Sequence, residues 1–315
     1  MKILFLCPDY FGIYQIIEEG IRKNTGCELT SLIFKEYRYK NIFGKVINFL
    51  SKTLLNKNLK KIWASRERME LMKGQDGHFD YIFVICPDFM QIDDLKILIA
   101  KADKSIVYYW DSFAIIPRYK ESFSLFDKHF TFEPKDAIDY NMKFLPNFYS
   151  QTIKNSDLDN DVFYIGTLDK RYPLLLKILK AVEDHNRSAK VFLLTKKKME
   201  SKFPDKISFI REAIPFSESE KIYAKSRVLL DVQKTIQDGL TFRVFEALGQ
   251  HKKLITTNAD VVNYDFYDPQ NIFIWKPNTT EIPASFFELP YKELPENIYQ
   301  KYSLDSWVNT IFDSK

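Results

Sequence analysis

The hydrophobic positions of the first half of the chain fall into short apolar runs, separated by stretches with helical spacing. Between the first two runs, Ile13, Ile16, Ile17, Gly20 and Ile21 recur at helical intervals, and residues 92–99 repeat the pattern. Short runs with both faces buried, separated by helices, indicate a parallel sheet with right-handed crossovers. The strands predicted for this half are Lys2–Cys7, Glu28–Phe34, Tyr81–Cys86, Ser105–Trp110, His129–Phe132 and Lys143–Leu145.

The rhythm breaks at residues 145–149, and the polar stretch 154–161 follows, so we expect the interdomain linker there. The pattern then restarts, with helices near residues 174–182 and 218–225 and a terminal helix over 303–312. The strands predicted for this half are Val162–Gly166, Val191–Leu194, Ile207–Ile210, Val228–Val232, Leu254–Thr257 and Asn271–Trp275. We therefore predict an α/β protein with two Rossmann-like, doubly wound domains. Any two-domain doubly wound protein, such as a periplasmic-type binder or a sugar-phosphate epimerase, shares this order.

Composition narrows the class of protein. A length of 315 residues favours two domains. The apolar run at the amino terminus is too short for a signal peptide, and no run reaches the roughly 20 residues of a membrane span. The odd number of cysteines without metal-ligand spacing indicates free thiols in a reducing compartment, so we expect a cytoplasmic protein. A net charge of +4 does not imply a nucleic-acid partner.

The most informative segment runs from Asp231 to Asn258. A strand end is followed by a polar loop with Gly239, a short amphipathic helix that begins at Thr241, and another strand. Such a unit points the helix amino terminus at the carboxyl edge of the sheet, where open α/β sheets bind anionic ligands. Asp238 and Glu246, separated by seven residues, lie within this unit.

This arrangement resembles the donor-sugar motif of GT-B glycosyltransferases, especially the retaining family 4 type. The resemblance implies two Rossmann-like domains facing a cleft, with the acceptor on domain 1–148 and the nucleotide sugar on domain 149–300. It also implies that the helix over 301–315 packs towards the first domain. Residues 108–112 and 243–248 are similar to bacterial surface-polysaccharide and spore-maturation transferases.

The two acids take their roles from the resemblance. The acid that matches Glu246 binds the nucleotide ribose in that family, and carboxylate oxygens readily accept hydrogen bonds from a diol. Asp238 matches the acid that contacts the transferred sugar, although its side chain is shorter and Asp-Gly is also an ordinary turn pair. Alternatively, Glu246 is a solvated acid that pairs with Arg243 three residues away.

The loop-to-helix junction is the predicted diphosphate site. Backbone N–H groups of Gly239, Leu240 and Thr241 are positioned to hold phosphates with help from the helix dipole, and Arg243 is within reach. Thr241 also suits a simple helix cap.

A second predicted contribution comes from the first strand of the second domain. The resemblance implies a strand that ends near Gly166, followed by a base on the donor phosphates, here Lys170 or Arg171. These cations would neutralise the charge of the leaving group. Lys196 ends another strand at the same edge. A turn with solvated cations is the plain alternative for all of these basic residues.

In the first domain, Asp9, Asp88 and Asp111 follow three different strands, and we expect all three at one sheet edge. Asp9 and Asp111 are our candidates for catalysis. If the reaction inverts, such an acid serves as general base for the acceptor hydroxyl; if it retains, these acids orient the acceptor.

The segment Tyr39–Trp63 is amphipathic and basic, with no acidic residue from Tyr37 to Arg66. Its six lysines, about 1 kcal/mol each, suit an anionic leaflet, and the segment is a candidate contact with the inner face of the cell membrane. Two ordinary helices packed on the first domain would carry the same pattern.

The sequence therefore predicts a metal-independent glycosyltransferase. It would move a sugar from a nucleoside diphosphate donor to a glycan or lipid-linked glycan in bacterial surface polysaccharide assembly. An Asp-x-Asp motif, Asp157-Leu158-Asp159, lies in the expected linker, and phosphate-loop and GxGxxG motifs are absent. The alternatives are a non-hydrolysing sugar-nucleotide epimerase and a catalytically silent GT-B module that binds a glycan or a partner.

Overall fold

The computed structural model describes residues 1–35, 37–71, 77–150, 158–197, 199–200, 203–234 and 236–313. The chain forms two compact units. Unit 1 is Met1–Leu145 with Val308–Lys315, and unit 2 is Pro146–Trp307. These limits lie near the expected ones at residues 148 and 300, which stay predictions.

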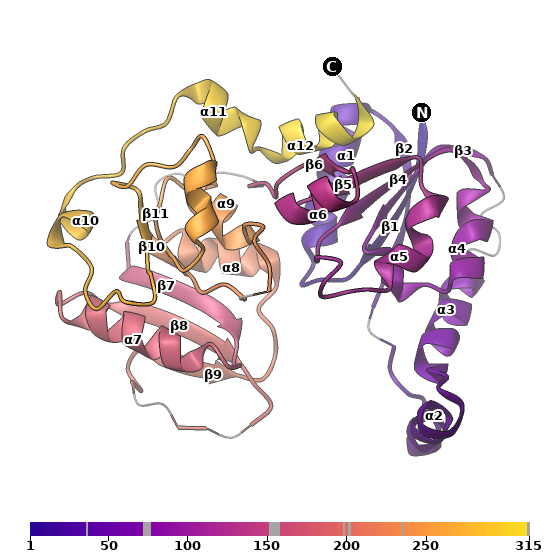
Figure 1. Ribbon diagram of the computed structural model, residues 1–315, viewed down its shortest axis with the longest axis horizontal. Coiled ribbons are helices and arrows are strands. Elements are labelled where there is room, and N and C mark those ends of the chain that lie inside the picture. The colour runs from indigo at the N-terminus through magenta and orange to yellow at the C-terminus, as the bar shows by residue number, and fades with distance from the viewer. Residues whose placement is uncertain are drawn as a thin grey trace. The chain divides into compact units, whose positions relative to one another are not determined.

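Unit 1 is built on a six-stranded parallel sheet with the order β2-β1-β3-β4-β5-β6 (Figure 1). Its strands are β1 (Lys2–Pro8), β2 (Glu28–Phe34), β3 (Phe79–Ile85), β4 (Ala102–Tyr109), β5 (Lys128–Thr131) and β6 (Lys143–Phe144). Its helices are α1 (Ile13–Thr25), α2 (Ile42–Leu55), α3 (Leu59–Leu71), α4 (Ile92–Ile99), α5 (Tyr119–Ser122) and α6 (Pro134–Asp139), with 3₁₀ turns η1 (Pro87–Phe89) and η2 (Phe123–Leu125).

Unit 2 carries a second six-stranded parallel sheet with the order β12-β11-β10-β7-β8-β9. Its strands are β7 (Asn160–Thr167), β8 (Ala189–Leu194), β9 (Ile207–Ile210), β10 (Ser226–Asp231), β11 (Lys253–Thr256) and β12 (Ile272–Ile274). Its helices are α7 (Tyr172–Glu183), α8 (Phe216–Tyr223), α9 (Phe242–Gly249), α10 (Ala284–Glu288) and α11 (Glu296–Lys301), with the 3₁₀ turn η3 (Ala259–Asn263).

The apolar runs became strands because alternate side chains fill opposite cores of each sheet. In β7, Val162 and Tyr164 enter one core while Phe163 enters the other, and Leu229 of β10 joins Phe163. Helix α7 covers the first core and α9 the second. Strands buried on both faces read as continuous apolar runs, which is why every strand predicted from the sequence is present and the α/β fold class is confirmed.

The strand orders fix where ligands bind in such sheets. In unit 2 the order reverses between β7 and β10, and in unit 1 between β1 and β3. Ligands of open α/β sheets bind at the carboxyl ends of strands at such a switch point, because the flanking crossovers lie on opposite faces and leave a crevice. The loops after β7, β10, β1 and β3 are therefore the places to look.

Helix α12 (Leu304–Phe312) contains the point at which the chain passes from unit 2 to unit 1. Within unit 2, Trp307 packs on Phe148, with ring centroids 4.8 Å apart. Within unit 1, Phe312 packs edge-on against Phe83. The terminal helix thus contributes aromatic side chains to both units.

All three cysteines are free thiols, as the sequence predicts, and each is buried. In the described part of the chain, no helix has the length and apolarity to cross a membrane.

Candidate active site

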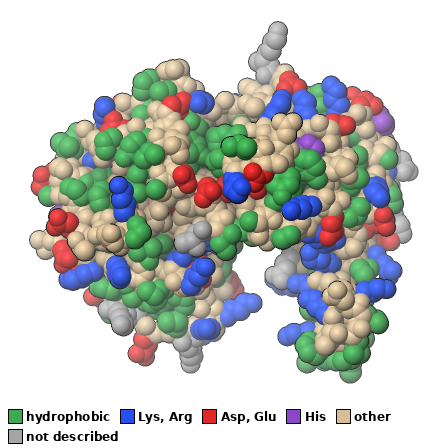
Figure 2. All heavy atoms as spheres, viewed as in Figure 1, with side chains coloured by type: hydrophobic (Ala, Val, Ile, Leu, Met, Phe, Trp, Pro, Cys, Tyr) green, Lys and Arg blue, Asp and Glu red, His purple; other side chains and the backbone are tan. Residues whose placement is uncertain are grey.

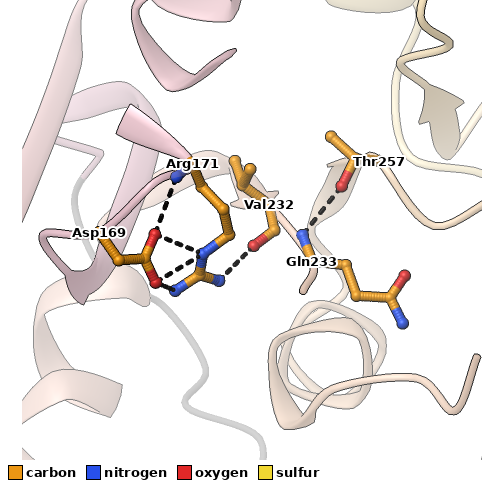
Figure 3. Close-up of polar contacts among 5 residues, drawn as sticks. All are labelled: Asp169, Arg171, Val232, Gln233 and Thr257. Carbon is orange, nitrogen blue, oxygen red and sulfur yellow. Dashed lines mark hydrogen bonds and ion pairs between the residues drawn. The ribbon is translucent and has the colours of Figure 1, made fainter. Parts of the chain in front are cut away.

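The loop between β10 and α9 is shaped by two side-chain amides. Gln233 donates through Nε2 to the carbonyl oxygens of Gln237 and Gly239, the latter at 3.2 Å. Asn258 donates through Nδ2 to the carbonyl oxygen of Asp238 at 2.9 Å. The backbone N–H of Gln233 is itself bonded to Thr257 Oγ1 at 2.8 Å (Figure 3). Hydrogen bonds within unit 2 therefore hold the described residues of this loop.

Asp231, at the end of β10, connects this strand to the start of α9 and to β11 through hydrogen bonds. Its carboxylate accepts hydrogen bonds from Thr241 Oγ1 at 2.9 Å and from Thr256 Oγ1 at 2.8 Å. Burial raises the pKa of the Asp231 carboxyl, and the two hydroxyl hydrogen bonds oppose that shift. Thr241 occupies the N-cap position of α9 without a side-chain capping bond, since its hydroxyl serves Asp231 instead. The simple-cap reading of Thr241 is thus wrong.

Glu246 lies inside the unit rather than on a solvated helix face. Its side chain is 4 % exposed, and its Oε2 lies 2.7 Å from Nη1 of Arg243, which is 13 % exposed. The expected Arg243 pairing is present, but the solvated alternative is wrong because α9 turns this face towards α8 and the sheet. Burial raises the pKa of Glu246; Arg243 opposes the shift and Glu220 adds to it.

The Arg243–Glu246 contact has ion-pair distance but poor hydrogen-bond direction. Neither Arg243 Nη1 nor Glu246 Oε2 makes a hydrogen bond within the described residues, although both atoms are buried. The Arg243 guanidinium instead lies over the rings of Tyr223, at 5.1 Å, and Phe163, at 5.7 Å. Buried polar atoms without aligned partners are rare in folded proteins.

The loop after β7 brings a guanidinium to the same switch point. Arg171 makes a bidentate pair with Asp169, with Nη2 2.7 Å from Oδ2, and donates through Nη1 to the carbonyl oxygen of Val232 at 2.5 Å (Figure 3). The hydrogen bonds from Arg171 hold the pKa of Asp169 below its usual range. These hydrogen bonds link the loop after β7 to the loop after β10, at the carboxyl ends of the two strands.

The remaining predicted donor residues are distributed along this edge. Lys170 is exposed and makes no ion pair with any residue that the structure describes. Lys196 is exposed just beyond β8, which neighbours β7. Asp238 is also exposed, and its charge contributes to the raised pKa of Asp260, after burial of Asp260 itself. Leu240 is buried, and its carbonyl accepts from Asn147 Nδ2 at 3.0 Å.

Gly166 has a packing reason of its own. A Cβ atom there would lie 2.6 Å from the hydroxyl oxygen of Tyr164, which folds over the glycine. That close approach is within the unit, so the absence of a side chain at Gly166 does not by itself require a ligand.

In unit 1, Asp9, Asp88 and Asp111 follow β1, β3 and β4, which are adjacent strands. Asp9 accepts the backbone N–H of Gly12 through Oδ1 at 3.1 Å, which shapes the β1–α1 loop. Burial raises the pKa of Asp88, against the nearby charges of Lys61 and Arg118.

The same edge of unit 1 holds two residues in left-handed backbone conformation. Phe11 has φ 56° and Cys86 has φ 53°, at the ends of β1 and β3. Three of the other positive-φ residues of the described chain are asparagines, Asn56, Asn141 and Asn186, which tolerate this region. Burial raises the pKa of Cys86 to about 12, so it is a neutral thiol. Strain of this kind clusters at functional sites.

Sequence reasoning passed over several of these residues. Asp231 and Asn258 bounded the motif, but their roles depend on hydrogen bonds with Thr241 and Asp238 that form only when the segment folds back on itself. Gln233 carried no signal beyond a polar loop position.

No group of His, Cys, Asp or Glu in the described ranges has the geometry to hold a metal ion. Asp157, the first acid of the Asp-x-Asp motif, lies outside the described residues.

Some solved structures of other proteins are similar to this one over nearly the whole chain. No family model and no curated protein matches the chain. Among solved structures, it is similar to the protein described as "Trehalose-6-phosphate from E. coli bound with UDP-2-fluoro glucose", with 10% identity, TM-score 0.59, and coverage of 99% of this chain and 98% of that one. It is also similar to the UDP-GlcNAc 2-epimerase of Neisseria meningitidis bound to UDP-GlcNAc, with 13% identity, TM-score 0.53, and coverage of 99% of both chains.

These matches extend over nearly the whole chain, through both units. The protein therefore has the GT-B fold, and the resemblance seen in the sequence is confirmed at the level of the fold. At such low identities the fold alone is shared.

Proposed function

We propose that this protein is a metal-independent GT-B glycosyltransferase. It transfers a sugar from a nucleoside diphosphate donor to a glycan or lipid-linked glycan hydroxyl. The observation that carries the proposal is the β10–α9 loop, which lies at the sheet's switch point, is held in shape by Gln233 and Asn258, and adjoins the Arg171 guanidinium.

In this proposal the donor diphosphate lies against the backbone of Gly239, Leu240 and Thr241 at the amino end of α9. The N–H groups and helix dipole there favour an anion. Arg171 and Lys170 add positive charge from the β7 loop, and Lys196 from the next strand. Because Asp169 already balances Arg171, Lys170 supplies the net charge on this side.

The ribose hydroxyls bind Glu246. Its Oε2 is buried without a well-aligned donor, and a diol supplies hydrogen bonds to it, while the Arg243 charge opposes the rise in the pKa of Glu246. Asp238 lies exposed at the loop tip, where it contacts the transferred sugar.

Unit 1 serves the acceptor. Asp9 and Asp111 orient the acceptor hydroxyl, and with inversion an acid of this edge removes its proton. The acceptor belongs to bacterial surface polysaccharide assembly, on the cytoplasmic side of the membrane, as the similarity of residues 108–112 and 243–248 suggests.

The test is a thermal-shift panel of nucleoside diphosphates and their sugars. We expect saturable stabilisation by at least one nucleotide. Glu246→Gln keeps the side-chain volume and removes the charge, so we expect binding about 10- to 100-fold weaker, as for loss of a hydrogen bond to a charged group. Glu218→Gln, on the exposed face of α8, is the matched control and should bind normally. Absence of a shift with every nucleotide would exclude a nucleotide-sugar enzyme.

The epimerase alternative has its own support in the structural match to a UDP-GlcNAc 2-epimerase. The two functions differ in their need for an acceptor. A transferase releases nucleoside diphosphate when a glycan acceptor is added, whereas an epimerase interconverts its sugar nucleotide without one. Conversion of the sugar nucleotide to its epimer in the absence of acceptor would replace our proposal. Nucleotide binding with neither activity indicates the silent module.

A further inference from the structure

Helix α2 of unit 1 buries polar side chains and exposes apolar ones. Its buried residues are polar, Asn48 and Ser51. Asn48 accepts the Lys60 N–H through Oδ1 at 2.9 Å and donates to the Tyr39 hydroxyl at 2.7 Å, and Ser51 Oγ donates to the Lys57 carbonyl at 3.0 Å. These bonds attach α2 to the start of α3 through its polar face.

The apolar side chains of α2 face away from the protein. Each of them is at least 48% exposed: Ile42, Phe43, Val46, Ile47, Phe49, Leu50, Leu54 and Leu55. At 3.6 residues per turn all of them except Ile47 and Leu55 cover the face opposite Asn48 and Ser51. A soluble monomer seldom exposes so many large apolar residues together, so this face marks an interaction surface.

Positive charge borders this apolar face. Lys45 and Lys52 lie seven residues apart along one flank of α2, and no acidic residue occurs from Tyr37 to Arg66. Figure 1 shows α2 and α3 projecting from the sheet of unit 1, and Figure 2 shows hydrophobic side chains at the end of that projection with Lys and Arg beside them. An apolar face edged by lysines is complementary to a surface of acyl chains under anionic headgroups.

We propose that α2 binds an anionic lipid bilayer, lying in the headgroup region with its apolar face towards the acyl chains. Its 14 residues extend about 21 Å, too short to span a bilayer. A second copy fits this face less well, because a twofold contact would bring the same lysines near one another. The inference does not depend on the donor site, since no residue of α2 belongs to it.

The test is co-sedimentation of the full chain with vesicles of phosphatidylcholine, alone or mixed in equal parts with phosphatidylglycerol. We expect binding to the anionic vesicles that weakens as salt is added. The triple variant Phe43→Ser, Phe49→Ser, Leu50→Ser should bind at least 100-fold more weakly, because three large apolar side chains no longer leave water. Lys45→Glu with Lys52→Glu should bind about 25-fold more weakly, at about fivefold for each lysine.

Matched controls separate the surface from general effects. Ile138→Ser removes an apolar side chain of α6 that is 82% exposed, and Lys177→Glu with Lys276→Glu makes the same charge change elsewhere. Both should bind vesicles as the unchanged protein does. All variants should keep the nucleotide thermal shift, so that failure of the donor proposal and failure of this one are told apart.

Two outcomes would overturn the proposal. The first is equal vesicle binding by the triple α2 variant. The second is a dimer in solution that the triple variant converts to monomer, with no vesicle binding by either form; α2 would then be a contact between copies.

Discussion

The carboxyl edges of the two sheets have the same layout but are built in different ways. In unit 2, the acids Asp231 and Glu246 are buried, and side chains of the same unit hold the loop that joins them. In unit 1, Asp88 is half-buried among cations, and left-handed backbone at Phe11 and Cys86 sets the turns. Side-chain hydrogen bonds hold the loop of unit 2, whereas in unit 1 left-handed backbone adds to the hydrogen bond that Asp9 accepts from Gly12.

This difference matches the demands of two ligands. A diphosphate and a ribose present fixed hydrogen-bonding groups, which a rigid loop recognises at little entropic cost. An acceptor hydroxyl needs a carboxyl that can gain and lose a proton, and a half-buried acid with a raised pKa suits that need. The contrast therefore supports the assignment of donor to unit 2 and acceptor to unit 1.

The largest expected effect is the stability loss in Glu246→Ala. Removing this carboxylate leaves the buried Arg243 unpaired, which should lower the free energy of unfolding by about 3–5 kcal/mol. Asp88→Ala, at the half-buried edge of unit 1, should cost less than about 1 kcal/mol, because water replaces the lost partner. Urea unfolding of both variants measures the difference. Equal losses would show that the two edges are not built differently.

The next effect is in the pH dependence of stability. Because the folded-state pKa of Asp231 is raised, the folded protein binds more protons than the unfolded one just above the unfolded value of 3.8. Stability from this group is full below that value and falls as pH rises through the folded pKa. Asp231→Asn removes this fall, which is at most about 1.4 kcal/mol per pH unit.

Asp88→Asn should change the slope in the same direction but less, since Lys61 and Arg118 oppose the shift at Asp88. Unfolding free energies measured in urea at several pH values from 4 to 7 provide the check. A slope in Asp231→Asn identical to that of the unchanged protein would refute the buried-acid description of unit 2.

The smallest effect concerns the backbone. Phe11→Gly relieves a left-handed conformation at an exposed side chain, and should stabilise the protein by up to about 1 kcal/mol. The matched change Phe49→Gly, within α2, should destabilise by about 1 kcal/mol, because glycine is a poor helix former. Loss of stability in Phe11→Gly would mean that the aromatic ring, not the turn, is what the β1–α1 loop needs.

Part of the candidate site could be predicted from the sequence, because it depends on residues that are close together along the chain. The strand–loop–helix pattern around Gly239 and the spacing of Asp238 and Glu246 located the loop, and the polar ends of β1, β3 and β4 located the acids of unit 1. The burial of Glu246 could not be predicted from the sequence. The polar face of α9 meets α8, whose Glu220 and Tyr223 come from an earlier part of the chain. The same holds for Gln233, whose two acceptors depend on how the loop closes.

The sequence by itself determined the strands and their parallel arrangement, since apolar periodicity and short connections restrict the chain to few topologies. It also determined that residues 39–63 are basic and amphipathic. The GT-B fold was implied by the resemblance of the segment from Asp231 to Asn258 to a donor-sugar motif. Only the tertiary structure decided that α2 turns its apolar face outwards, that Thr241 serves Asp231, and that Glu246 is buried against Arg243. Periodicity reports which residues share a face, whereas burial and pairing depend on what distant segments bring to that face.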